Sequence, residues 1–103
     1  GDSLRIPSAA SFAPTPLSIY QTYLSHCSEK VAPNCRDELH SSIIYGNQIV
    51  SETCCSNLVN GVGTQCFQEM AKFIVTIPNL NQKKEEIFQR SIKVWKDCAA
   101  QKL

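Results

Sequence analysis

The sequence lacks an excess of charge of either sign. Its 103 residues contain 10 Lys and Arg against 9 Asp and Glu, which leaves a formal net charge of +1 at pH 7. Proteins that bind nucleic acid present a strongly basic surface, and so do helices that attack anionic membranes. The near-neutral balance therefore predicts no nucleic-acid partner and counts against an antimicrobial protein that acts on membranes.

Long apolar runs are also missing. No stretch approaches the roughly 20 apolar residues that a membrane-spanning helix needs, and no segment alternates apolar and polar residues as a half-buried strand does. The first residues, Gly1–Arg5, lack the apolar core of a secretory signal peptide, so we interpret the sequence as the mature form of an exported chain. No Asn-X-Ser/Thr acceptor occurs, and N-glycosylation is not expected.

Residues that could carry catalysis are scarce. The two histidines, His26 and His40, stand outside any arrangement typical of a nucleophile with its base, and no glycine-rich phosphate loop occurs. We interpret both histidines as ordinary polar surface. The sequence therefore predicts a protein that is not an enzyme and that uses no cofactor.

Cysteine, in contrast, is abundant. An even number of cysteines in a short chain favours a disulfide framework made in an oxidising compartment, and hence a secreted, extracellular protein. Six cysteines allow 15 pairings, among which spacing alone does not choose. The six are Cys27, Cys35, Cys54, Cys55, Cys66 and Cys98.

The two ends of the chain differ in composition. Residues 1–15 contain Pro7 and Pro14 among serines and alanines, which indicates an extended or disordered N-terminal arm. Residues 16–103 are predicted to form a single helical, disulfide-rich domain, because a chain of this length allows only one. The apolar residues of the arm are Leu4, Ile6 and Phe12.

The first two of four predicted helices precede the adjacent cysteines. The first begins with Thr15 as cap and Pro16 as its first residue, and it ends before Pro33. Its apolar face consists of Leu17, Tyr20, Leu24, Cys27 and Val31. The second helix is expected to be capped by Asn34 and to end at Gly46. In its first turn, where the helix dipole favours acids, it carries Asp37 and Glu38.

The third predicted helix is long and contains two glycines. It begins at the cap Ser51 and ends at Pro78. Gly61 and Gly63 each cost about 1 kcal/mol relative to alanine within a helix, so either a neighbouring helix approaches closely or the helix breaks there. The apolar face consists of Cys55, Leu58, Val59, Val62, Cys66, Met70, Phe73 and Ile77.

The fourth predicted helix begins at a capping box formed by Asn79 and Gln82. Glu86 and Arg90 form a favourable i,i+4 pair on its exposed side. Its inward residues are Ile87, Phe88, Ser91, Ile92, Trp95 and Cys98. We interpret its basic residues as a solvated face, since Glu85, Glu86 and Asp97 offset Lys83, Lys84, Arg90, Lys93 and Lys96. The predicted class is all-α with four helices.

The adjacent cysteines, Cys54 and Cys55, indicate a junction. Neighbouring residues of a helix point about 100° apart, so each sulfur must reach a different part of the chain. A bridge between the two would need a strained ring. Zinc and thioredoxin-type sites use C-x2-C pairs, which the sequence lacks, so no metal site is predicted.

The cysteine spacing C-x7-C-x18-CC-x10-C-x31-C occurs together with three local motifs. These are CRDEL from Cys35, VNGVGTQC from Val59 and VWKDC from Val94. The pattern resembles the prolamin-like family, small secreted plant proteins many of which are associated with the ovule or egg cell. The resemblance covers Leu17–Cys98 and extends to the wider prolamin superfamily, which includes lipid-transfer proteins. It implies a four-helix, disulfide-stapled bundle.

The resemblance also implies a disulfide pairing. By the superfamily's order of linkage, Cys27 pairs with Cys66, Cys35 with Cys54, and Cys55 with Cys98. Cys54 would then tie the third helix to the second, and Cys55 would tie it to the fourth.

For function, the resemblance implies a recognition or signalling protein of plant reproduction that binds an extracellular or membrane-receptor protein. On a stapled scaffold, affinity comes from loops and exposed apolar groups. The candidate partner-binding residues lie between two helix caps, and the N-terminal arm is a second candidate. Val50 has the alternative interpretation of a hydrophobic staple at the start of the third helix. The candidate residues are Tyr45, Asn47, Gln48, Ile49 and Val50.

Two alternatives remain open. A lipid or another small apolar ligand could bind in a tunnel between the helices, lined by Leu, Ile, Val and Phe. A lipid-transfer protein, however, has eight cysteines with a C-x-C pair after the double cysteine, and this sequence has only Cys66 in that region. A defence protein that inhibits digestive enzymes or microbes is the other alternative.

Overall fold

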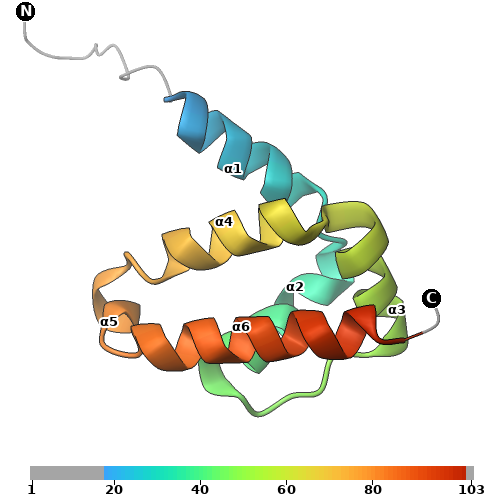
Figure 1. Ribbon diagram of the computed structural model, residues 1–103. Coiled ribbons are helices and arrows are strands. Elements are labelled where there is room, and N and C mark those ends of the chain that lie inside the picture. The colour runs from blue at the N-terminus through green and yellow to red at the C-terminus, as the bar shows by residue number, and fades with distance from the viewer. Residues whose placement is uncertain (1–17, 102–103) are drawn as a thin grey trace, which may run out of the picture.

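The computed structural model describes residues 18–101, and this part of the chain is helical without strands, as predicted (Figure 1). The predicted arm, residues 1–15, and the predicted first residues of the first helix lie outside the described residues. The elements are α1 (Ile19–Glu29), α2 (Pro33–His40), η1 (Ser41–Tyr45), α3 (Glu52–Ser56), η2 (Asn57–Val62), α4 (Thr64–Ile74), α5 (Pro78–Asn81) and α6 (Lys84–Ala99).

The helices form a bundle around α6. Figure 1 shows α4 and α6 running in opposite directions with α5 connecting them at one end, and the two helices are in contact. The π-helical segments η1 and η2 continue α2 and α3, and both pack against α6. Helix α1 packs against α4, and its first turns project away from the bundle. The irregular segment 46–50 passes along the outer side of α6.

Helix α1 begins at a capping box formed by Ser18 and Gln21. The Ser18 backbone is extended, and its hydroxyl accepts a hydrogen bond from the Gln21 N–H at 3.0 Å. The Gln21 side-chain oxygen in turn accepts one from the Ser18 N–H at 2.9 Å. This capping box starts α1 at Ile19, and the predicted cap Thr15 and first helical residue Pro16 lie outside the described residues.

Helix α2 begins earlier than predicted. Its cap is Ala32, whose backbone N–H donates to the side-chain oxygen of Asn57 at 3.0 Å, and Pro33 occupies the first helical position. The prediction that Asn34 caps the helix was wrong, because Asn57 from a distant element satisfies the free N–H. Asp37 and Glu38 accordingly fall beyond the first turn.

The end of the second helix agrees with the prediction. After η1 the chain reverses at Gly46, which has a left-handed backbone with φ of 70°. An added Cβ at Gly46 would lie 2.7 Å from Arg90 Nε, so both the backbone angle and the neighbouring side chain favour glycine.

The third predicted helix is divided at Gly63. Ser51 caps α3 as predicted, accepting a hydrogen bond from the Cys54 N–H at 3.3 Å. Gly63 has φ of 86° and ψ of 160°, which ends η2, and α4 then starts in a new direction. At Gly61 an added Cβ would lie 3.1 Å from the side-chain nitrogen of Asn57, which belongs to the same element, and 3.9 Å from the Lys30 carbonyl oxygen at the end of α1. The second distance is an ordinary contact, so the close approach of a neighbouring helix that was considered is not found there.

The break changes which residues of α4 face the core. Phe67 is buried and stacks on Trp95, with ring centroids 6.2 Å apart. Phe73 is 48% exposed and Ile77 is 39% exposed, so their predicted places on the apolar face were wrong. If the helix continued through Gly63, the residues predicted from the helical spacing, such as Phe73, would face the core. Because α4 starts in a new direction, Phe67 faces the core instead.

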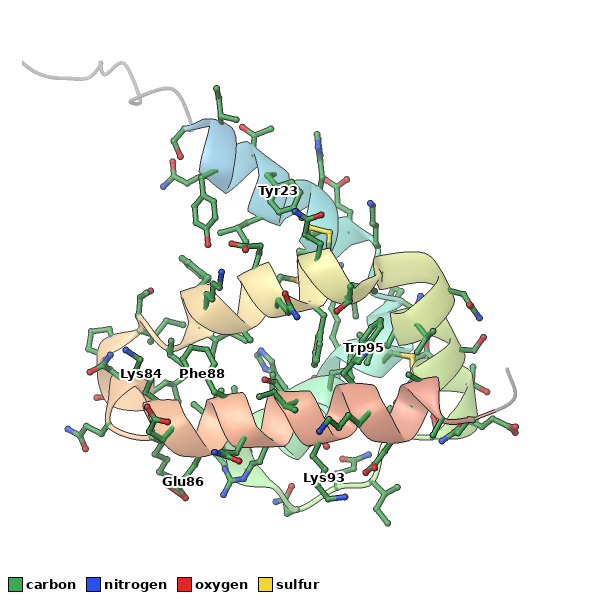
Figure 2. All side chains as sticks on the ribbon, in the orientation of Figure 1. Tyr23, Lys84, Glu86, Phe88, Lys93 and Trp95 are labelled. Carbon is green, nitrogen blue, oxygen red and sulfur yellow. A yellow bond between two sulfur atoms is a disulfide. The ribbon has the colours of Figure 1, made fainter. Side chains whose placement is uncertain are left out.

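The start of α6 also differs from the prediction. Asn79 and Gln82 form no capping box, because α5 occupies Pro78–Asn81 and α6 begins only at Lys84. Figure 2 shows Phe88 and Trp95 on the side of α6 that faces α4, and both are half-buried. Ile92 is 55% exposed and does not face inward as predicted. The buried residues of α6 are Ile87, Ser91, Val94 and Cys98.

Three disulfides connect the helices. Cys27–Cys66 joins α1 to α4, Cys35–Cys54 joins α2 to α3, and Cys55–Cys98 joins α3 to α6; these are the pairs that the resemblance implies. The paired Cα atoms lie 4.9–5.4 Å apart, and all six side chains are buried. The loops they close span 39, 19 and 43 residues, so each bridge contributes about 3–4 kcal/mol by loss of chain entropy in the unfolded state.

Candidate partner-binding groove

A groove of about 430 Å³ lies between segment 46–50 and α6. Asn47, Gln48 and Ile49, all predicted as partner-binding residues, line one side of it and are exposed. The side chain of Ile49 is 92% exposed. An apolar side chain that the fold leaves almost entirely in water is available to a partner at no cost to the core.

The Gly46 end of the segment is fixed by hydrogen bonds. The Gly46 N–H donates to the Ser41 carbonyl oxygen at 2.9 Å. Arg90 Nη1 donates to the Ile44 carbonyl oxygen at 2.8 Å, which connects α6 to the end of η1. These two hydrogen bonds fix the direction in which segment 46–50 leaves η1.

The other end is fixed by a carboxylate. Glu38 accepts a hydrogen bond from the Ser51 N–H at 2.7 Å and one from the Ser51 hydroxyl at 3.2 Å. Val50, just before it, is only 8% exposed. With both ends held, segment 46–50 has little freedom to lose on binding, which is the advantage of a preorganised site.

The floor of the groove is apolar. It contains Val50, Val94 and the Cys55–Cys98 bridge, all buried. Cys55 Sγ lies 3.9 Å from the Val50 carbonyl oxygen. Val50 thus belongs to the core beside the start of α3, in the position of a hydrophobic staple, and its prediction as an exposed contact is corrected.

The opposite wall carries charges from α6. Figure 2 shows Lys93 on the side of α6 away from Trp95, toward segment 46–50. Lys93 Nζ lies 2.8 Å from Asp97 Oδ2, and both side chains are mostly exposed. Arg90 lines the groove too, but its partner Glu86, 3.4 Å away, does not. The lining of the groove thus includes two cationic side chains, Arg90 and Lys93, and one carboxylate, Asp97.

The structure brings together only part of the predicted site. Tyr45 is 64% exposed but does not line the groove. The predictions from the sequence missed the whole α6 wall, since Arg90, Lys93 and Asp97 were interpreted as an ordinary solvated face. The implied pairing of Cys55 with Cys98 was the one signal that could have found it, because that bond brings the end of α6 next to Val50.

A second groove, of about 400 Å³, lies between α2–η1 and α4. Its lining is mainly apolar, and it includes the buried side chains of Leu39, Ile43 and Phe67. Arg36 and His40 lie at its edge and are exposed. Both grooves open to the surface, which differs from the tunnel expected for a lipid carrier.

Residues 18–101 hold no cluster of three or more His, Cys, Asp or Glu side chains that could bind a metal ion. His26 and His40 are both exposed. Within the same part of the chain, none of the helices combines the length and apolar character needed to cross a bilayer.

Comparison with known proteins gives one match. The family model described as Prolamin-like matches residues 26–99, which include all six cysteines, the segment 46–50 and the whole of α6. No curated protein and no solved structure matches the chain.

Proposed function

Since the chain belongs to the prolamin-like family, we propose that it is an extracellular recognition protein of plants that acts in reproduction by binding a protein partner. The partner is a receptor on a cell surface or another extracellular protein. The reproductive setting is inferred from what the family resemblance implies. The small, disulfide-rich fold is consistent with an extracellular location.

One observation carries the proposal: Ile49 is 92% exposed on a segment whose two ends are fixed. A protein gains nothing in stability from an apolar side chain held in water. In a recognition protein, the same side chain becomes a contact that loses its water when the partner binds. The groove next to it provides the complementary hollow for a side chain of the partner.

The proposed function requires no catalysis, metal or cofactor. The groove's charged groups form short-range pairs with each other or with the backbone, as Lys93 does with Asp97 and Arg90 with Ile44. Such pairs can orient a partner, and none of them includes a nucleophile with a base.

The test is binding of the fluorescently labelled, oxidised protein to the surface of intact plant reproductive cells. We expect binding that saturates and that excess unlabelled protein displaces. Ile49→Asp is expected to lose it, while Ile92→Asp, which changes an exposed isoleucine of α6 outside the groove lining, keeps it. Unsaturable binding, or equal binding by the two variants, would contradict the proposal.

A second candidate, binding of an apolar ligand, is favoured by the groove between α2–η1 and α4, with its apolar lining. Titration with a fluorescent fatty acid separates the two functions. Saturable micromolar binding that Met70→Asp abolishes and Phe73→Asp leaves intact would support lipid binding, since Met70 lines this groove and Phe73 does not. If fatty-acid binding does not saturate, lipid binding is rejected and protein binding remains as the proposed function.

A further inference from the structure

The main chain of segment 46–50 has unused hydrogen-bonding groups. Among the described residues, no backbone hydrogen bond uses the N–H or the carbonyl oxygen of Asn47, Gln48 or Ile49. All three residues are exposed, so water can reach this stretch of the chain in the free protein. A partner backbone could replace that water with N–H···O bonds at little free-energy cost.

These free groups lie beside a hollow. The same three residues line the groove whose floor is Val94 and the Cys55–Cys98 bridge. A chain lying along the segment would therefore be close both to unpaired main-chain groups and to an apolar depression. This combination distinguishes segment 46–50 from an ordinary surface loop.

The backbone of the segment is held in place from both ends. The hydrogen bonds of Gly46 and Ser51 fix its start and its end, and Cys55–Cys98 holds the facing wall, α6, against α3. Only residues 47–50 separate the two anchored positions, which limits how far the segment can move from the groove. A partner strand would lose only its own conformational freedom on binding.

We propose that the groove binds an extended peptide segment of the partner, which pairs its main chain with Asn47–Ile49 in the manner of an added strand. One apolar side chain of the peptide lies over Val94 and the Cys55–Cys98 bridge. Peptides added to an exposed backbone in this way gain affinity from main-chain bonds and specificity from pockets for alternate side chains. This inference rests on the proposed function and names the kind of partner segment.

The charged side chains of the groove favour peptides of one charge. Arg90 lies at the Gly46 end, where Glu86 offsets part of its charge from outside the groove, so the lining itself holds two cationic side chains and one carboxylate. Lys93 and Asp97 largely compensate each other. The favoured peptide therefore carries an aspartate or glutamate near its apolar residue, on the side toward Arg90.

The test uses a displayed library of random linear heptapeptides, selected on the oxidised full chain and counter-selected on Ile49→Asp. We expect enriched sequences with one apolar residue and a nearby acid. The best peptide is then synthesised with a single N-methyl group at each position in turn. Strand pairing predicts that methylation at alternate positions lowers affinity about tenfold or more, because alternate N–H groups point toward segment 46–50.

Two further results decide the inference. Amide hydrogen exchange at Asn47–Ile49 should slow on peptide binding, which side-chain contacts alone would not produce. Peptides that bind without slowed exchange, or that tolerate N-methylation everywhere, would overturn the proposal, and so would a failure to enrich any sequence. One combination of results separates the two proposals. If binding to cells is saturable and depends on Ile49 but the peptide experiments fail, the proposed function is retained and the extended-peptide inference is rejected.

Discussion

Arg90 Nη1 donates a hydrogen bond to the carbonyl oxygen of Ile44 at 2.8 Å, across 46 residues of chain. Ile44 is buried, so its carbonyl oxygen has little access to water once the guanidinium is removed. We expect Arg90→Met to lower the free energy of unfolding by about 1–3 kcal/mol. Urea denaturation of the oxidised protein measures this.

Lys72→Met is the control for that variant. Lys72 forms only an exposed pair with Glu69 at 3.1 Å, and its loss should change stability by less than about 1 kcal/mol. Equal effects of the two substitutions would show that Arg90 acts as an ordinary surface residue.

Asn57 makes two hydrogen bonds to the turn between α1 and α2. It accepts from the Ala32 N–H at 3.0 Å and donates to the Lys30 carbonyl oxygen at 3.1 Å. Asn57→Ala should cost about 1–3 kcal/mol of stability. Asn60→Ala, in the same element but bonded only to Ser56, should cost less than about 1 kcal/mol. Thermal unfolding of both variants tests the difference.

Gly63 adopts a backbone angle that other residues rarely do, with φ of 86°. No heavy atom lies within 4 Å of an added Cβ, so alanine there would be penalised by its backbone alone. We expect Gly63→Ala to lose about 1–3 kcal/mol. The neighbouring exposed substitution Thr64→Ala should stay within about 0.5 kcal/mol of the wild type. Denaturant unfolding that found Gly63→Ala equally stable would contradict the division of the helix.

Two disulfides close loops of similar length, so removing each in turn distinguishes an effect on stability from an effect on binding. The loops closed by Cys27–Cys66 and Cys55–Cys98 span 39 and 43 residues, so replacing either pair with serines should cost about 3–4 kcal/mol. Only the second bridge lies under the groove. Under conditions where both variants remain folded, we expect weaker binding of the selected peptide in the second variant alone. Comparable affinities would place the binding surface elsewhere.

Ile49 and Val50 are neighbours with opposite environments, 92% and 8% exposed. Ile49→Asp should leave stability within about 0.5 kcal/mol of the wild type, whereas Val50→Asp, which buries a charge without a partner, should prevent stable folding. Circular dichroism during heating measures both. A fully folded Val50→Asp variant would contradict the placement of Val50 in the core and would restore its prediction as an exposed partner contact.

Local patterns predicted the parts of the fold that local chemistry decides. Gly46 ends the second helix because only glycine adopts its backbone angle easily, and Ser51 caps α3 because its hydroxyl accepts a free N–H. The start of α2 could not be predicted in this way. The N–H of its cap residue, Ala32, is satisfied by Asn57, which lies 25 residues further along the chain.

Which face of α4 is buried could not be predicted from local patterns either. Apolar residues continue at helical spacing through Gly63, so periodicity alone could not choose between a break and a close approach. The three-dimensional structure shows the break, at Gly63, and no close approach of a neighbouring helix at Gly61. The exposure of Phe73 follows from that choice.

The candidate site was predictable on one side only. Residues 47–49 were predicted because a short segment between two caps must lie at the surface. Lys93 and Asp97 are charged, exposed and spaced for a helical pair, which is also the pattern of any solvated helix. Their place opposite Ile49 depends on a tertiary arrangement that periodicity does not encode.

The adjacent sulfurs of α3 have a consequence for how the chain matures. Exchanging the partners of Cys54 and Cys55 would give an isomer with nearly the same loop sizes, so polymer statistics hardly distinguish the two products. What distinguishes them is the direction in which each thiol points, and a helical turn beginning at Ser51 sets that direction. The native pairing therefore requires the orientation that this short helix gives to the two thiols.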